Sequence, residues 1–215
     1  MNYNTIIFII SLLVFTVLFF LSKDKYNDYI APLDKEEYGL KRFMPIGFYI
    51  LDSIGYTYNT KYDRKLLTKI TEVKGYDFAH YYMQVYWANR ITLILFTLII
   101  LSLIGIGVGN DPAYLFFEII ILVVVAIVGD IELDKKIKER RLSIQIDFPD
   151  FINKLTLLIN AGMPVGKAWE KIVDDNKKDA PLYEELAFTQ AEIRSGKSEY
   201  KAYEDFAKRC RTPEV

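Results

Sequence analysis

Three long apolar stretches dominate the pattern of hydrophobic and polar positions in this chain. In order along the chain they are Tyr3–Ser22, Ile91–Gly109 and Ala113–Gly129. Each is close to the ~20 residues that an α-helix needs to cross a membrane. The aromatic residues Tyr86 and Trp87 and the basic residue Arg90 come directly before the second stretch. Aromatic and basic residues at the end of an apolar stretch are typical of a membrane interface. The pattern therefore predicts three transmembrane helices.

The residues around these stretches favour particular connections. Asn110, Asp111 and Pro112 form a turn signal, so residues 91–129 are expected to make a tight transmembrane hairpin. A cleavable signal peptide has basic residues before its apolar region. Here no basic residue precedes the first stretch, and Lys23 follows it. We therefore interpret residues 1–22 as an uncleaved N-terminal transmembrane anchor.

Residues 23–90 are predicted to form an aromatic-rich linker of short helices. An apolar stripe over residues 64–73 indicates an amphipathic helix that ends at Gly75. Asp77 is expected to cap the next helix, which runs directly into the second apolar stretch. The apolar segment Phe43–Leu51 is predicted to lie on the membrane surface or against the second polar block.

Residues 130–215 follow the 3.6-residue period of amphipathic helices. The charged connector 130–141 is expected to continue the third span as an exposed helix, and residues 142–146 fit a strand or a helix equally. Four helices of about 11–15 residues are then predicted, and they would pack as an antiparallel bundle. The residues that mark their starts are Pro149, Pro164, Pro181 and Ser198, and a fifth start signal is Thr212-Pro213-Glu214.

The inner faces of these helices are predicted from the same period. The residues expected there are Phe148, Phe151, Ile152, Leu155, Leu158, Ile159, Val165, Ala168, Trp169, Ile172, Val173, Tyr200, Tyr203, Phe206, Ala207 and Cys210. The fold class is accordingly all-α, with three transmembrane helices and a cytoplasmic helical bundle.

The charge distribution sets an expected orientation. The chain has 27 basic and 28 acidic residues, and this balance argues against nucleic acid as a partner. Eleven of the basic residues lie in 23–90 and the other sixteen in 130–215. Because cytoplasmic loops carry the excess of Lys and Arg, both blocks are expected in the cytoplasm and the N-terminus outside. We therefore expect a multi-pass protein of the inner (cytoplasmic) cell membrane.

Little in the sequence favours catalysis. One cysteine, Cys210, and one histidine, His80, exclude a disulfide framework, a cysteine-based zinc site and a multi-histidine metal site. The chain has no glycine-rich phosphate loop and no nucleophile motif. We therefore expect no catalytic, cofactor or metal site, and we interpret Cys210 and His80 as structural.

Two features inside the predicted spans leave alternatives open. Glu118 lies within the third span, where it could reach the membrane interface or a partner helix, or could serve an ion-translocating subunit or a membrane enzyme. Gly105 and Gly109 have a GxxxG spacing, which permits close helix packing and also fits a helix end before a turn.

Two segments of the second block resemble the type II secretion system F-domain family. The first is FPDFINKLTLLINAGMPVGKAWEKIV, residues 148–173, with a proline, an apolar helix, an Ala-Gly turn and a second proline. The second is residues 181–215, with a Glu184-Glu185 pair and a TPEV ending. The structural determinants that the resemblance singles out are Pro149, Leu155, Gly162, Pro164, Ala168, Pro181 and Gly196.

The order of segments is similar to the tight-adherence (Tad/Flp) pilus assembly platform proteins of the TadB/TadC type. The resemblance implies a non-enzymatic role that couples a hexameric secretion ATPase to pilin extraction and assembly. It implies as partners this ATPase, a sister F-domain platform protein, pilin subunits and membrane lipid, within a homo- or hetero-oligomer. The F domain of that family usually has further helices and one more span, so the bundle here is expected to be incomplete at its C-terminal end.

Candidate partner-binding residues are charged groups on expected turns and helix starts. They are Asp174, Asp175, Glu184, Glu185 and Lys197. The alternative function is a membrane-anchored scaffold or receptor unrelated to pili, which would share the topology without binding a secretion ATPase.

Overall fold

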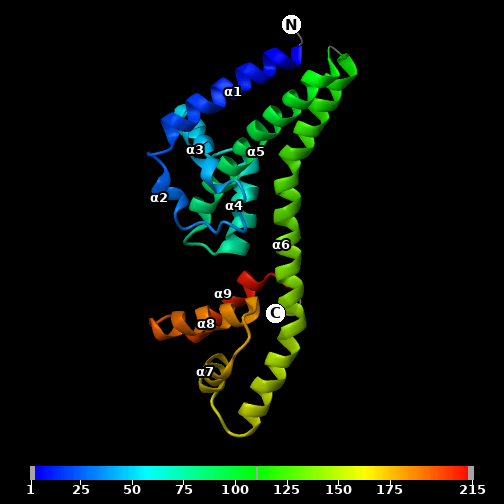
Figure 1. The fold of residues 1–215 in the computed structure, drawn as a ribbon. Helices are drawn as coiled ribbons and strands as arrows, with labels where there is room; N and C mark the ends of the chain where they lie inside the picture. Colours follow the sequence, from blue (N-terminus) through cyan, green and yellow to red (C-terminus); the bar gives the residue numbers. More distant parts are fainter. Residues whose placement is uncertain (1–2, 110, 213–215) are drawn as a thin grey trace. The chain divides into compact units, whose positions relative to one another are not determined.

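Helices account for 80% of the chain in the computed structural model, which describes residues 3–109 and 111–212 (Figure 1). No β-strand occurs among those residues. The elements in chain order are α1 (Tyr3–Ser22), α2 (Asn27–Ile30), the 3₁₀ helix η1 (Lys41–Phe43), α3 (Met44–Ser53), α4 (Lys61–Lys74), α5 (Ala79–Val108), α6 (Pro112–Asn160), α7 (Val165–Asp175), α8 (Pro181–Arg194) and α9 (Glu199–Cys210).

Three of these helices, α1, α5 and α6, are long and apolar enough to cross a membrane. They contain the three stretches predicted from the sequence, so the protein has the composition of a membrane protein. The chain divides into two compact units, the first up to Leu133 and the second from Asp134 on. The linker predicted over residues 23–90 belongs to the same unit as the spans.

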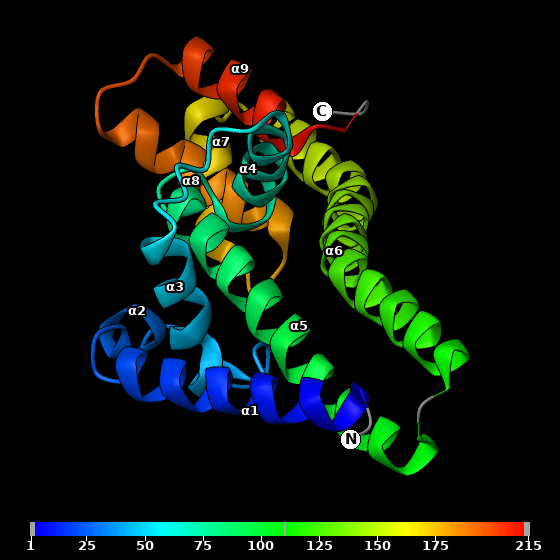
Figure 2. The same cartoon turned by 90° about the horizontal axis from the view of Figure 1, so that it is seen from above.

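The first unit is built around α5, which α1, α3 and α4 contact (Figure 2). Gly47 of α3 lies so close to α5 that a Cβ atom there would be 2.1 Å from the Ala88 carbonyl oxygen. The two backbones can therefore approach only because position 47 is glycine. In the first unit α3 packs on α1 and α5, and the prediction that residues 43–51 lie on the membrane surface or against the second block stays a prediction.

The boundaries of α4 and α5 show how local chemistry sets helix ends. A helix predicted over 64–73 is confirmed as α4, and Gly75, with φ +81°, ends it. Asp77 does not cap α5: the helix begins at Ala79 after Phe78, and no side chain caps it. The Ala79 N–H is instead bonded to the Tyr76 carbonyl at 3.3 Å, so a backbone turn takes up the position of Asp77.

The prediction that a helix starts at Pro149 is wrong, because α6 is continuous over 49 residues and contains Pro149 in its interior. The ambiguous residues 142–146 are helical for the same reason. Proline has a φ that fits a helix and removes only one backbone donor, although this usually costs about 3 kcal/mol. Ile144 and Phe151, seven residues apart on one helical face, are both buried in the same core, and this packing favours continuation of the helix.

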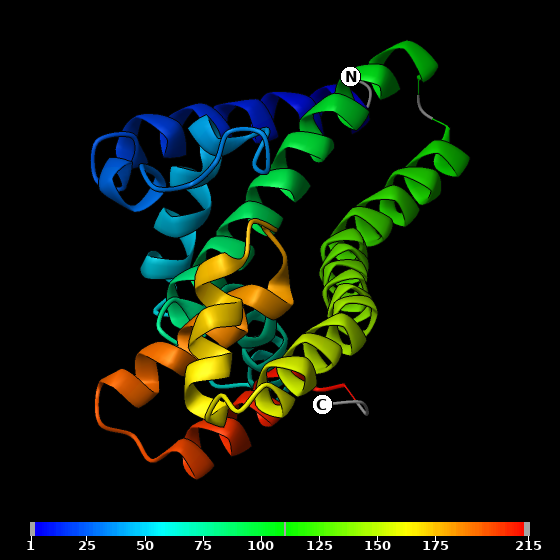
Figure 3. The same cartoon turned by 90° about the horizontal axis from the view of Figure 1, so that it is seen from below.

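The second unit joins the C-terminal part of α6 to α7, α8 and α9 through short turns (Figure 3). Gly162 follows α6 with φ +90° and Gly196 follows α8 with φ +99°, conformations that favour glycine. Pro181 occupies the first turn of α8, as predicted, whereas Pro164 is the extended residue just before α7. Ser198 precedes α9 as expected, although its side chain makes no capping hydrogen bond.

Four of the predicted inner-face residues are wrong, because Ile152, Ile159, Val165 and Tyr200 are exposed. Tyr200 is the clearest case. Tyr200 is 80% exposed, whereas Ala202, Phe206 and Cys210 are the buried residues of α9. At ~100° per residue, position 200 lies roughly 120° around the helix from the centre of that buried stripe. The predicted fifth helix falls mainly on residues 213–215, which lie outside the described residues.

Candidate functional site: charged surface and polar interior

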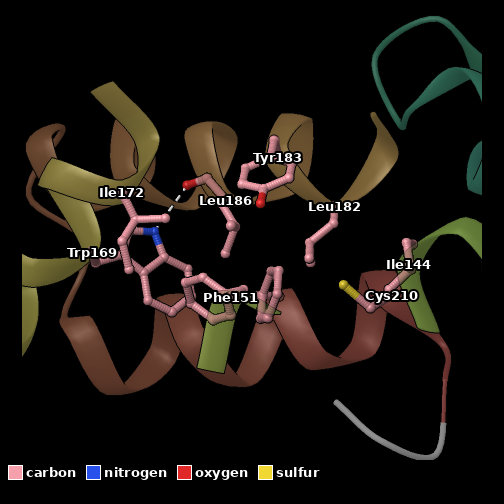
Figure 4. Close-up of a cluster of buried hydrophobic side chains, with 9 residues drawn as sticks. Ile144, Phe151, Trp169, Ile172, Leu182, Tyr183, Leu186 and Cys210 are labelled. Carbon is pink, nitrogen blue, oxygen red and sulfur yellow. Dashed lines mark hydrogen bonds between the residues drawn. The ribbon is translucent and has the colours of Figure 1, made fainter. Parts of the chain in front are cut away.

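The predicted partner-binding residues surround a compact aromatic core in the second unit. Trp169 of α7 lies at its centre, with ring centroids 5.1 Å from Phe151 of α6 and 5.4 Å from Phe206 of α9. The Trp169 indole N–H donates to the Leu186 carbonyl of α8 at 3.1 Å, as the dashed line in Figure 4 shows. The core therefore joins all four helices and gives their outer residues fixed positions. Leu155 packs against its edge and Ala168 is fully buried.

Cys210 belongs to this core. Figure 4 shows its sulfur atom among the labelled apolar side chains, and the residue is fully buried. Burial raises the pKa of the Cys210 thiol to about 12. A thiol that stays protonated at neutral pH is a poor nucleophile, which favours the structural interpretation.

Glu185, a predicted contact residue, is held inside the second unit. Its two carboxylate oxygens accept from Arg140 of α6 at 2.6 Å and from Arg209 of α9 at 2.7 Å. Arg209 also donates to Thr189 at 2.8 Å and to Glu192 at 3.1 Å. The Glu185 side chain is only 15% exposed. This arrangement ties three helices together, so Glu185 has an intramolecular role besides the predicted contact.

Lys197, in the turn after α8, is engaged in a similar way. Its ammonium group donates to Glu192 and forms an ion pair with Asp205 at 2.8 Å. The hydrogen bonds to Asp205 and Glu192 raise the pKa of Lys197. Lys197 thus connects the turn between α8 and α9 to both helices.

The remaining candidates face outward. Glu184 is exposed in the first turn of α8 and makes no ion pair with a described residue. Asp174 and Asp175 are exposed at the end of α7, where Asp175 pairs with Lys171 at 3.0 Å. Of the five candidates, Glu184 and Asp174 are therefore the most accessible carboxylates for a partner.

A groove of about 510 Å³ lies next to the loop between α7 and α8. Its floor is apolar and its rim carries lysines that are largely paired to aspartates, for example Lys178 to Asp147 at 3.0 Å. The lining residues are Lys154, Leu157, Leu158, Lys171, Ile172, Asp175, Asn176, Lys177, Lys178 and Tyr183. Asp175 thus forms part of a hollow surface, whereas Glu184 is not among its lining residues.

In the first unit, an acidic side chain joins α6 to α4 and α5. Asp130 of α6 accepts hydrogen bonds from Tyr62 and from Tyr86, the latter at 2.8 Å, and pairs with Arg90 at 3.6 Å. The Arg90 guanidinium also donates to Tyr62 at 2.8 Å and lies 5.3 Å from the Trp87 ring. This Asp130 cluster, which consists of Asp130, Tyr62, Tyr86 and Arg90, fixes α6 at the start of the charged connector.

Asp63 is a buried carboxylate that sequence reasoning missed. It is fully buried and accepts from the Thr60 hydroxyl at 2.7 Å, Tyr56 at 2.9 Å and the Trp87 indole N–H at 2.9 Å. Burial acts to raise the pKa of Asp63, but the hydrogen bonds from Thr60, Tyr56 and Trp87 outweigh it and lower the pKa. The signal was present in the sequence as a Thr-x-x-Asp capping box at residues 60–63.

Glu118 of α6 is another buried carboxylate of the first unit, which also contains the buried Glu72 of α4. It is only 4% exposed, so the interpretation that it reaches the membrane interface has no support from its environment. Gly105 contacts Asn4 and Tyr114 within the same chain, and Gly109, with φ +87°, ends α5. The GxxxG spacing therefore serves close packing at one glycine and a helix end at the other.

Comparison with known proteins identifies no relative: no family model, no curated protein and no solved structure matches this chain. Among the described residues, no group of three or more His, Cys, Asp or Glu side chains could hold a metal ion. What the site can do must therefore be argued from its own geometry.

Proposed function

We propose that this protein is a non-enzymatic platform component of a type IV (Tad/Flp-like) pilus assembly or type II secretion machine in the cytoplasmic membrane. It would couple a hexameric secretion ATPase to the extraction and assembly of pilin subunits, together with a sister F-domain platform protein. Residues 134–215 would be its F-type domain. Support comes from the resemblance of residues 148–173 and 181–215 and from the three helices that could cross a membrane.

The observation that carries the proposal is the continuity of α6. One helix contains the third apolar stretch, the charged connector and the core residues Ile144 and Phe151. A force that acts on α7–α9 would therefore pass along one hydrogen-bonded helix to the span. The Asp130 cluster would pass part of that force to α4 and α5.

In this proposal both charged blocks lie in the cytoplasm, where the excess of Lys and Arg favours them. The ATPase would contact the exposed carboxylates Glu184 and Asp174, since Glu185 and Lys197 are already paired within the unit. Glu185 and Lys197 would instead keep the turns of the contact surface in place.

The test is retention of the ATPase by charge-reversed variants. Tagged chains are purified from native membranes in mild detergent, and the co-purifying ATPase is identified and quantified by mass spectrometry. Glu184→Lys combined with Asp174→Lys is expected to reduce retention at least tenfold. Glu199→Lys is the matched control, because it reverses an exposed carboxylate in the first turn of α9.

Equal retention by the variant and the wild-type chain would remove Glu184 and Asp174 from the contact surface. Failure of the folded wild-type chain to retain any secretion ATPase or F-domain partner, from membranes that contain them, would contradict the platform function itself.

A further inference from the structure

Two buried side chains near the outer ends of the spans have oxygen atoms with no hydrogen-bond donor. Glu118 of α6 is 4% exposed, and its Oε1 atom has no partner among the described residues. Asn4 of α1 is 1% exposed; its Nδ2 donates to the carbonyls of Gly105 at 2.9 Å and Gly109 at 3.2 Å, but its Oδ1 has no described partner. Buried polar groups are seldom left without a partner, so both require an explanation.

These groups belong to one region. A Cβ atom at Gly105 of α5 would lie 2.5 Å from the Tyr114 ring of α6 and 2.6 Å from Asn4 Cγ. Tyr114 and Asn4 therefore meet at the same glycine. Glu118 follows Tyr114 by four residues, so it lies one turn further along the same face of α6.

The hydroxyl donors of this region are already used. Tyr114 donates to the Leu101 carbonyl at 2.6 Å, Ser102 to the Ile99 carbonyl at 3.1 Å and Ser11 to the Phe8 carbonyl at 3.1 Å. Ser102 and Ser11 are buried as well. The acceptors that remain without a donor are Glu118 Oε1 and Asn4 Oδ1.

The described residues of the three apolar stretches supply no cationic side chain to match them. Residues 3–22, 91–109 and 113–129 contain no Lys, Arg or His, and Glu118 is their only charged residue. An isolated carboxylate in a membrane interior is strongly disfavoured unless something neutralises it. Because Glu118 and Asn4 are more than nine-tenths buried, neither a lipid headgroup nor a side chain of another protein can reach them. A water molecule or a small ion can meet these conditions, but only a cation also neutralises the carboxylate.

We propose that Glu118 is an intramembrane site for one small cation, taken up as a proton on the carboxylate or as a sodium ion at its unpartnered oxygen, with Asn4 supplying a further free oxygen in the same region. Carboxylate and amide oxygens suit both, since hard cations and protons are held by such groups in membrane transport proteins. This proposal goes beyond the platform function and does not depend on it.

The test uses the purified full-length chain in detergent and compares the wild type with Glu118→Gln and the control Asp24→Asn, an exposed carboxylate after α1. Thermal unfolding is measured in NaCl and in choline chloride at equal ionic strength, over a series of pH values. A ligand that binds only the folded state raises the midpoint with its concentration. A sodium site predicts a higher midpoint in NaCl for the wild type and Asp24→Asn, and no such shift for Glu118→Gln.

A proton site predicts instead that the wild-type midpoint, relative to that of Glu118→Gln, rises as the pH falls and does not respond to sodium. If Glu118→Gln does not fold, the wild-type chain is studied by infrared spectroscopy over a series of pH values. The spectra show directly whether the chain has a carboxylic-acid band that is protected from hydrogen exchange and changes with pH. Identical sodium and pH responses in the wild type and Glu118→Gln would overturn the proposal and leave water as the partner of these oxygens. If only the wild type folds, the overturning result is the absence of a titrating band together with no effect of sodium on the wild-type midpoint.

Discussion

Two of the buried carboxylates of the first unit, Asp63 and Glu118, have surroundings that differ. Asp63 is fully buried, and donors from Tyr56 and Thr60 before α4 and from Trp87 of α5 converge on its oxygens. Glu118 is almost as deeply buried, but one of its oxygens has no donor among the described residues. The two side chains are equally hidden from solvent, so burial alone does not distinguish them.

The difference lies in the supply of donors. Around Asp63 the fold provides two hydroxyls, an indole N–H and a backbone N–H, and the carboxylate serves as a structural centre. Around Glu118 the hydroxyls donate to backbone carbonyls, and the carboxylate remains free to take up a proton or an ion. A buried acid with a full set of donors holds the fold together, whereas one without them is a candidate for binding.

Removal of the Asp63 carboxylate should have the largest effect. Asp63→Ala leaves the Tyr56, Thr60 and Trp87 donors without their acceptor, and we expect the free energy of unfolding to fall by about 3–5 kcal/mol. Thermal or denaturant unfolding in detergent measures it. The control Asp52→Ala breaks an exposed pair with Lys25 and should cost no more than about 1 kcal/mol. A loss below 1 kcal/mol for Asp63→Ala would contradict the structural role.

A second comparison concerns the packing around Gly47 and around Gly105. A Cβ atom at Gly47 would meet the Ala88 backbone, whereas one at Gly105 would meet the side chains of Asn4 and Tyr114. Side chains can move aside more easily than backbone. We expect Gly47→Ala to destabilise by about 3 kcal/mol and Gly105→Ala by about 1 kcal/mol. Unfolding midpoints of the two variants give the order, and the reverse order would show that the surroundings of Gly105 are the more tightly packed.

Replacement by the neutral amide should change stability in opposite directions at Asp63 and at Glu118. Asp63→Asn is expected to destabilise, since an amide cannot accept as many hydrogen bonds as a carboxylate. Glu118→Gln, measured in choline chloride at pH 8, is expected to leave stability unchanged or to raise it by about 1 kcal/mol, because an uncompensated buried charge is removed. A large loss for Glu118→Gln under these conditions would mean that an unrecognised donor holds this carboxylate.

The smallest effect concerns surface carboxylates of the second unit. Hydrogen bonds from Lys208 to Glu204, from Lys197 to Asp205 and from Lys167 to Glu170 lower the pKa of each acid. Their contribution to stability is therefore complete above the ordinary values of 4.5 for Glu and 3.8 for Asp and is lost as the pH falls below them. Unfolding midpoints at pH 7 and pH 3.5 should show this loss, and 1 M salt should reduce it. An unfolding midpoint that rises as the pH falls would contradict the stabilising role of these lysine–carboxylate pairs.

Much of the fold follows from periodicity. The three apolar stretches, the bounds of α4 and the buried stripe of α7 were all predictable, because burial of an apolar face is the main determinant of these helices. Pro149 was misjudged because a local signal for a helix start competes with the packing of Ile144 and Phe151, which lies outside a local sequence window.

The polar interior was less predictable. Residue types indicate that Glu185 and Lys197 are charged, but not that Arg140, Arg209 and Asp205 would approach them from other helices. Asn4 gave no sequence signal at all, since its significance comes from its contact with Gly105 a hundred residues away. Such contacts depend on tertiary packing.

The central claim, that the chain is an assembly platform, is tested most directly by its partners. The tagged wild-type chain is purified from native membranes in mild detergent, and the proteins that co-purify with it are identified by mass spectrometry. We predict a hexameric secretion ATPase and a second polytopic F-domain protein in near-stoichiometric amounts. Recovery of the folded, membrane-inserted chain without either protein, from cells that produce both, would contradict the account.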